Sequence, residues 1–181
     1  MKMNLPNKLT MLRVIMVPVF VLCMLLPIEG KAPDIIAGII FIAASLTDTL
    51  DGQIARKYNL VTVFGKFMDP LADKLLVCSA LICLVSVERI AAWIVIVIIA
   101  REFIISGFRL VAVQKGVVIA AGWWGKAKTA VTMVTIVLLV FDLGGPINVI
   151  AQVLVWVSLA LTIISLVDYL WKNRSVLAEE E

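Results

Sequence analysis

Six long apolar stretches constrain the fold of this chain more than any other feature. They cover approximately residues 9–27, 34–54, 67–87, 90–113, 125–141 and 147–171. Each is close to the ~20 residues that an α-helix needs to cross a hydrocarbon layer of ~30 Å. The stretches are continuous instead of alternating, which excludes a transmembrane β-barrel. We therefore expect an all-α, polytopic membrane protein with six transmembrane helices.

The composition agrees with a membrane protein. Of the 181 residues, 62% are hydrophobic and the mean hydropathy is +1.09, which excludes a soluble domain with a wet surface. We expect a single membrane domain over residues 1–181, in which residues 1–8 form a short interfacial segment before the first helix. The first apolar stretch has no small-residue cleavage site after it, so we expect it to be retained. The chain has no histidine, so acid–base chemistry must fall to carboxylates.

The positions of lysine and arginine predict the orientation, because positive residues stay on the cytoplasmic side. If the N-terminus is inside, the outer turns hold only Lys31 and Arg89. The inner helix ends then hold Lys2, Lys8, Arg13, Arg56, Lys57, Lys66, Lys115, Lys126, Lys128, Lys172 and Arg174. We expect both termini to be cytoplasmic, in the plasma or inner membrane.

Four aspartates lie within residues 45–74 of a chain that otherwise largely avoids charge. Asp48 and Asp51 are three residues apart, and Asp69 and Asp73 are four apart, so each pair shares one face of a helix. A rise of ~1.5 Å per residue places Asp48 and Asp73 at ~9 Å below the inner face, with Asp51 and Asp69 shallower at ~5 and ~3 Å. Four crowded carboxylates repel one another unless cations lie among them. This pattern predicts a magnesium or manganese site that acts on a phosphate-bearing substrate.

The fourth apolar stretch carries a second charged group, in which Glu102, Ser106 and Arg109 share one face with Arg101 beside them. Charged side chains within a transmembrane helix cost free energy when they face lipid, so we expect these residues to face the interior of the helix bundle. Arg101 and Glu102 either neutralise buried aspartates or belong to the site. Arg109 is closer to the predicted level of the aspartates, which favours a role as a phosphate ligand.

Basic and small residues near the same depth complete the candidate site. Lys126 and Lys128 precede the fifth apolar stretch, and we expect one of them to face the pocket and the other to face water. Gly52, Ala55 and Gly65 lie beside the carboxylates, where their small side chains would let the backbone approach a nucleotide. Helix packing explains each of these three residues equally well.

The aspartates belong to a longer pattern, Asp48-x2-Asp51-Gly52-x2-Ala55-Arg56-x8-Gly65-x3-Asp69-x3-Asp73. It matches, position for position, the signature of the CDP-alcohol phosphotransferase family, which this chain therefore resembles. Eight fixed positions within 26 residues make a chance match improbable. The flanking segments NLPNKLTMLRVIMVP, REFIISGFR and GKAKT resemble the bacterial branch that makes phosphatidylglycerophosphate.

The resemblance implies a six-helix fold, usually homodimeric, that transfers a phosphatidyl group from CDP-diacylglycerol to glycerol 3-phosphate in the membrane. It implies that Asp48, Asp51 and Asp69 bind Mg²⁺ or Mn²⁺ and the CDP pyrophosphate, while Asp73 is both metal ligand and base. Around the nucleotide it implies a pocket lined by Gly52, Ala55 and Gly65 and supported by Arg56.

Further ligands are predicted from the chemistry of the substrates. The dianionic acceptor needs its own cations, and we predict Arg109 and Lys126 as its first ligands, with Arg101 third. Near the N-terminus, Asn7, Thr10 and Arg13 could border the nucleotide pocket, although capping of the first helix explains Asn7 at least as well.

Two other readings of the same residues remain open. Within the family, the acceptor could be an inositol phosphate, serine or a second phospholipid, and the aspartates would look identical. Outside it, the carboxylates could form the pathway of a divalent-cation transporter. Transport would require polar residues in the outer half of the second and third helices, and these offer almost none. No nucleic-acid partner is expected.

Overall fold

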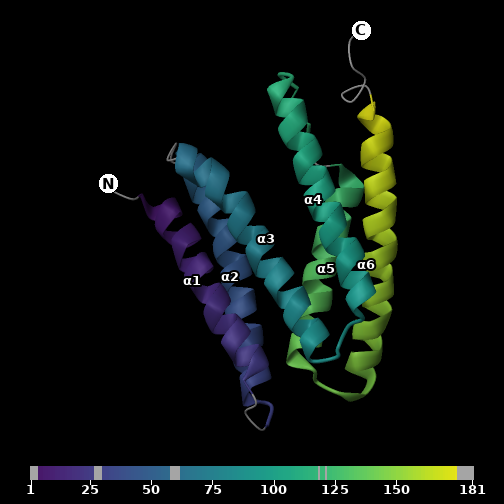
Figure 1. Ribbon diagram of the computed structural model, residues 1–181. Helices are drawn as coiled ribbons and strands as arrows, with labels where there is room; N and C mark the ends of the chain where they lie inside the picture. The colour runs from purple at the N-terminus through teal and green to yellow at the C-terminus, as the bar shows by residue number, and fades with distance from the viewer. Residues whose placement is uncertain (1–3, 27–29, 58–61, 118, 121, 175–181) are drawn as a thin grey trace. The chain divides into compact units, whose positions relative to one another are not determined.

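The computed structural model describes residues 4–26, 30–57, 62–117, 119–120 and 122–174, with the side chains of residues 5–6, 48–57, 63–64 and 66–67 left out. Within these ranges the chain forms α-helices joined by short connections (Figure 1). The helices are α1 (Leu5–Leu25), α2 (Ala32–Lys57), α3 (Val63–Ser86), α4 (Ala92–Gln114), α5 (Trp123–Phe141) and α6 (Gly145–Lys172). The predicted all-α architecture is confirmed.

Three of the helices are long and apolar enough to cross a membrane by length and composition. They provide the spans Asn7–Leu25, Trp123–Phe141 and Gly145–Lys172 within the described residues. The other three helices, α2, α3 and α4, carry most of the charged residues of the predicted site, and the remaining one, Lys126, is on α5. The chain is therefore a membrane protein, and the two helices that carry the predicted aspartates, α2 and α3, are its least apolar helices.

The N-terminal segment differs from the prediction. Residues 5–8 form the beginning of α1 instead of a separate interfacial segment, because Asn4 caps the helix: its side chain accepts a hydrogen bond from the Asn7 backbone N–H at 3.2 Å. Asn7, considered above as a cap, instead lies inside the first turns and is buried. Its side chain is thus available for contacts with another helix.

Helix α3 begins earlier than predicted. Thr62 caps it by accepting from the Gly65 backbone N–H at 2.9 Å, so the helix starts at Val63 and continues through Pro70. With these bounds Asp51 lies six residues before the end of α2, and Asp69 lies six residues after the start of α3. The two aspartates are therefore at equal distances from their helix ends, about 9 Å along each axis.

The chain divides into two compact units. The first comprises Met1–Arg89 with Ile136–Leu143, and the second comprises Ile90–Thr135 with Gly144–Glu181. In the first unit α1 packs against both α2 and α3. Phe20 of α1 lies with its ring centroid 5.9 Å from that of Phe41 in α2. Small buried residues let the three helices approach closely, among them Ala37, Ala44, Ala72 and Ala80.

Arg89 joins helix ends within the first unit. Arg89 donates to the Asp34 carboxylate in the first turn of α2 at 2.6 Å. The same guanidinium donates to the backbone carbonyls of Leu139 and Val140, near the end of α5, at 3.1 and 2.9 Å. These carbonyls have no intrahelical donor of their own at a helix end, so Arg89 satisfies them. One of the two predicted outer cations therefore has a structural role.

In the second unit α4 packs against α6. Phe108 of α4 meets the ring of Tyr169 of α6 edge to face, with centroids 5.5 Å apart, and Ile105 completes this small core. Near the start of α4, the ring centroid of Trp93 lies 5.9 Å from that of Trp156 in α6. Apolar contacts thus flank the polar residues of α4 from both sides.

Candidate active site

Thr10 fixes one of the four signature aspartates. Its side chain is fully buried, and its hydroxyl donates to Oδ1 of Asp69 at 2.6 Å. Asp69 itself is half-buried on α3. A short hydrogen bond from a buried hydroxyl to a carboxylate fixes the orientation of that carboxylate. Helix α1 therefore positions a predicted metal ligand of α3.

A second contact joins the same two helices next to Gly65. The Thr62 hydroxyl donates to Oδ1 of Asn7 at 2.9 Å, while the Gly65 N–H donates to the Thr62 hydroxyl. A Cβ on Gly65 would lie 3.1 Å from Asn7 Oδ1 and 3.6 Å from Asp69 Oδ2. A side chain at residue 65 would crowd these oxygens, which explains why glycine occupies this signature position.

Arg13 extends this buried polar face of α1. Asn7, Thr10 and Arg13 follow one another at intervals of three residues, and all three are buried. The Arg13 Nε donates to the backbone carbonyl of Ala44 at 3.2 Å, one turn before Asp48 on α2. The start of α1 is thus in contact with both helices that bear the aspartates.

The remaining signature residues lie at the end of α2 and in α3. Asp48, Asp51, Gly52, Ala55 and Arg56 are on the last three turns of α2, and their side chains are outside the described ones. Asp73 lies one turn beyond Asp69 on α3 and is half-buried. The structure therefore places the backbone of all four aspartates, and it describes the side chains of Asp69 and Asp73.

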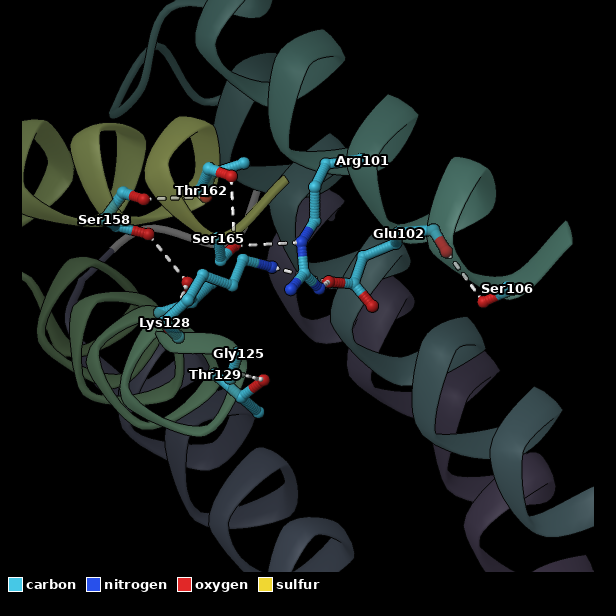
Figure 2. A network of polar contacts seen from close by, with 10 residues as sticks. Arg101, Glu102, Ser106, Gly125, Lys128, Thr129, Ser158, Thr162 and Ser165 are labelled. Atoms are coloured by element: carbon cyan, nitrogen blue, oxygen red, sulfur yellow. Dashed lines mark hydrogen bonds and ion pairs between the residues drawn. The ribbon is translucent and has the colours of Figure 1, made fainter. Parts of the chain in front are cut away.

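The second unit contains a network of charged and hydroxyl side chains from three helices (Figure 2). Glu102 Oε1 accepts from Arg101 Nη1 at 2.7 Å and from Lys128 Nζ at 2.8 Å. Arg101 and Lys128 are both buried, whereas Lys126 is exposed. The Arg101 Nε also donates to the Ser165 hydroxyl of α6 at 3.2 Å. One carboxylate thus holds two buried cations.

A glycine and a pair of hydroxyls adjoin this network. A Cβ on Gly125 would come within 3.3 Å of Arg101 Nη2, so glycine leaves space for the guanidinium. One turn after Lys128 on α5, the Thr132 hydroxyl lies 2.6 Å from the Ser158 hydroxyl and so links α5 to α6. This contact between hydroxyls helps to hold α5 in one rotation about its axis, with Lys128 facing inward.

Arg109 occupies a different position on α4. Its guanidinium lies over the ring of Tyr169, with Cζ 5.7 Å from the ring centroid. The side chain is half-buried, and its Nε has no hydrogen-bond partner among the described residues. Of the three predicted acceptor ligands, Arg101 is thus engaged by Glu102, Lys126 is exposed, and Arg109 retains an unpaired donor.

The comparison with protein families covers most of the chain. The family model described as CDP-alcohol phosphatidyltransferase matches residues 3–164. The chain belongs to this family. The resemblance drawn from the eight-position signature is therefore confirmed, because the match includes the complete signature.

Relatives within the CDP-alcohol phosphatidyltransferase family cover nearly the whole chain. A CDP-diacylglycerol--glycerol-3-phosphate 3-phosphatidyltransferase of Bacillus subtilis is 44% identical over 96% of this chain and 97% of its own length. One of Haemophilus influenzae is 40% identical over 94% and 93%. A probable phosphatidylglycerophosphate synthase of Mycobacterium tuberculosis is 43% identical over 92% of this chain and 79% of its own length.

CDP-alcohol phosphatidyltransferases use a divalent metal ion, and the chemistry of the described donors fits one. Thr10 occupies one oxygen of Asp69, so the other is oriented on the Gly65 side. Asp73 adds a second carboxylate one turn away, and carboxylate oxygens are the ligands that magnesium prefers. Among the side chains that the structure describes, no three acids or cysteines group around one point, but Asp48 and Asp51 are outside that set.

Two buried residues of the second unit, Lys128 and Tyr169, were not among the ligands predicted from the sequence. Lys128 is the buried lysine of GKAKT, although Lys126 was chosen. Tyr169 ends a buried polar stripe along the apolar helix α6, with successive spacings of four, three and four residues: Ser158, Thr162, Ser165 and Tyr169. This helical spacing was a signal in the sequence that could have identified the inward face of α6.

Proposed function

We propose that this chain transfers the phosphatidyl group of CDP-diacylglycerol to glycerol 3-phosphate, giving phosphatidylglycerophosphate and CMP. The observation that carries the proposal is the identity of 40–44% along almost the entire chain to relatives named for this transfer. The signature on α2 and α3 supports the nucleotide half of the reaction. The cations of α4 and α5 support a phosphorylated acceptor.

The reaction is a displacement at the phosphorus that bears the diacylglycerol. The terminal hydroxyl oxygen of glycerol 3-phosphate forms a bond to this phosphorus, and the bond from phosphorus to the bridging oxygen breaks. CMP leaves with the electron pair of that bond, and the proton of the hydroxyl passes to Asp73. A bound divalent ion would neutralise charge on the pyrophosphate and on the departing CMP.

The four aspartates would hold this ion. We assign Asp48, Asp51, Asp69 and Asp73 as ligands of Mg²⁺ or Mn²⁺, with Thr10 orienting Asp69 through its 2.6 Å hydrogen bond. A fixed orientation of the carboxylate matters because partners of a ligand raise metal affinity by restricting its movement. Asp73 serves both as a ligand and as the base.

The nucleotide would lie against the small residues of the signature. At Gly65 an added Cβ would crowd the side-chain oxygens of Asn7, Thr62 and Asp69, so glycine keeps these polar groups in place beside the proposed pocket. The proposed nucleotide-binding residues are Gly52, Ala55, Arg56, Gly65, Asn7 and Thr10.

The phosphate of the acceptor would be bound by basic residues of the second unit. We assign Arg109 first, because its buried Nε has no partner in the described part of the chain. Lys126 is exposed and could supply charge near the aqueous side. Arg101 is third, since its guanidinium is already held by Glu102 and Ser165.

The membrane arrangement follows from the same assignment. We propose six transmembrane helices, α1–α6, in one functional domain of residues 1–181 that is embedded in the inner or plasma membrane. Both termini would be cytoplasmic because lysine and arginine concentrate at the corresponding helix ends. The active form would be a homodimer, in contact with lipid on its exposed apolar helix faces.

A panel of acceptors tests the proposed reaction. Purified protein is incubated with CDP-diacylglycerol, magnesium and one acceptor at a time, and CMP release is measured. Glycerol 3-phosphate should release CMP, whereas serine, inositol phosphate and phosphatidylglycerol should not. Release with another acceptor but not with glycerol 3-phosphate would assign the chain to a different reaction of the same family.

A further inference from the structure

Two buried polar atoms in the second unit have no hydrogen-bond partner in the described part of the chain. They are the Arg109 Nε on α4 and the Tyr169 hydroxyl on α6. The Tyr169 side chain is only 6% exposed, so bulk water does not compensate for the missing partner. A buried polar group without a partner is destabilising, and such a group calls for an explanation such as a ligand.

The two residues are in direct contact. The Arg109 guanidinium carbon lies 5.7 Å from the centroid of the Tyr169 ring. The same ring is fixed by Phe108, which meets it edge to face at 5.5 Å. The ring of Tyr169 therefore holds the guanidinium by a cation–π contact while Phe108 holds the ring.

The core cluster around the ring consists of apolar side chains. Ile105, Ile119, Leu166 and Leu170 pack around Phe108 and Tyr169. An apolar wall strengthens the interaction of a cation with an anion, since water does not screen it. The position therefore combines one permanent positive charge and one hydroxyl with an apolar surround.

The position along the helices favours a water-soluble ligand. Arg109 is five residues before the end of α4, and Tyr169 is three residues before the end of α6. These distances correspond to about 8 and 5 Å along the helix axes. Helix C-termini carry partial negative charge, so an anion bound there depends on a side-chain cation such as Arg109.

We propose that Tyr169 is a specificity-determining residue for the acceptor, in which its ring positions Arg109 and its hydroxyl donates to the phosphomonoester that Arg109 binds. Both orphan atoms are donors, and a dianionic phosphate supplies acceptors for each of them. This assignment rests on the proposed function for the identity of the acceptor. It adds a ligand from α6, a helix that carries none of the signature residues.

Substitutions at Tyr169 separate the ring from the hydroxyl. Tyr169→Phe keeps the ring and removes the hydroxyl, and Tyr169→Leu removes both. Loss of a hydrogen bond to a charged group should raise the KM for glycerol 3-phosphate roughly tenfold or more in Tyr169→Phe, with the KM for CDP-diacylglycerol unchanged. Tyr169→Leu should raise it further, because Arg109 also loses its support.

A matched control removes a hydroxyl elsewhere. Ser86 is an exposed residue at the far end of α3 whose hydroxyl donates only locally, to the Ile82 carbonyl at 3.2 Å. Ser86→Ala should leave both KM values unchanged. Equal KM values for wild type and Tyr169→Phe would overturn the proposal, and so would a rise only in the KM for CDP-diacylglycerol, which would assign the anion to the lipid substrate.

A binding measurement keeps the test independent of the reaction. Inorganic phosphate should raise the unfolding temperature of the wild-type protein, and the rise should be much smaller in Tyr169→Phe. If the acceptor panel gave no product but this difference remained, the proposed reaction would fail and the anion site would stand. If the wild type made the product and phosphate protected both proteins equally, the role of Tyr169 would be wrong and the reaction would stand.

Discussion

Thr10 is enclosed on all sides, and its hydroxyl is directed at Asp69 across 2.6 Å. The residue lies outside the aspartate signature, yet it determines how one signature carboxylate is held. A partner of this kind restricts the rotation of the carboxylate and so lowers the entropic cost of binding a cation. The metal dependence of the enzyme should therefore respond to a residue that is not itself a ligand.

Thr10→Val removes the hydroxyl and keeps the shape of the side chain. We expect the magnesium concentration for half-maximal activity to rise at least roughly tenfold, because the orientation of Asp69 is lost. Thr10→Ser should restore the wild-type value. Thr129→Val is the control, since Thr129 is exposed and donates only to the Gly125 carbonyl. An unchanged magnesium requirement in Thr10→Val would show that this hydrogen bond does not serve the metal.

Glu102 compensates two buried cations through one oxygen, at 2.7 Å from Arg101 and 2.8 Å from Lys128. Lys128 is only 2% exposed, so its charge has no alternative contact with bulk water. Removing one member of a buried ion pair leaves the other charge uncompensated, which commonly costs 3–5 kcal/mol. Glu102 is therefore expected to contribute to stability as well as to the arrangement of the site.

Glu102→Ala should lower the unfolding free energy by about 3 kcal/mol, seen as a fall in the unfolding temperature of roughly 6–12 °C. The comparison is Asp168→Asn, which breaks the Asp168–Lys172 pair at 2.7 Å. Lys172 is exposed, so loss of this ion pair should change the unfolding free energy by less than about 1 kcal/mol. Equal effects of the two substitutions would mean that Lys128 is compensated in another way.

At the scale of helices, periodicity and length predicted each of the six elements, because long apolar stretches permit little else in a membrane. The ends of the helices were harder to predict from the sequence. The start of α1 depends on a single side chain, Asn4, whose hydrogen bond extends the helix to residue 5. Similarly, Thr62 caps α3 seven residues before Asp69, so the helix begins at Val63 and Pro70 lies inside it.

The rotation of a helix was also beyond sequence reasoning in one case. Lys126 and Lys128 are two residues apart, so they point in directions that differ by roughly 200° around α5. The sequence indicated that one lysine faces inward but not which one, because tertiary contacts of Thr132 with Ser158 fix the rotation. The proposed roles of the aspartates and glycines rest on their spacing, which is itself the signature, and they stay predictions.

Close packing between α2 and the end of α5 can be tested at Gly38. An added Cβ would lie 2.6–2.8 Å from the Phe141 ring, which requires the ring to move. Gly38→Ala should destabilise the protein by about 1 kcal/mol, because overpacking of 1–3 kcal/mol exceeds the gain in helix propensity of up to ~1 kcal/mol. Thermal unfolding measures the difference.

Gly107 provides the matched substitution. It lies within α4, and a Cβ there would meet no described atom within 4 Å. Gly107→Ala should therefore raise the unfolding temperature or leave it unchanged. If Gly38→Ala were as stable as Gly107→Ala, the Phe141 ring would have free space to retreat into and the packing argument would be wrong.

At the scale of the whole molecule, the two compact units carry different parts of the proposed chemistry. The first holds the aspartate signature on α2 and α3 together with the start of α1. The second holds the basic residues of α4 and α5 and the polar stripe of α6. We infer that the nucleotide-linked lipid and the soluble acceptor are recognised by separate sets of helices.

The transfer of label from radioactive glycerol 3-phosphate into lipid tests the central claim most directly. The wild-type protein, supplied with CDP-diacylglycerol, should move the label into the lipid phase with magnesium, lose this activity in a chelator and regain it when magnesium is restored. Asp73→Asn should transfer no label under any of these conditions while still binding CDP-diacylglycerol. Undiminished transfer in the chelator, or by Asp73→Asn, would contradict a reaction that depends on carboxylate-held metal and an aspartate base.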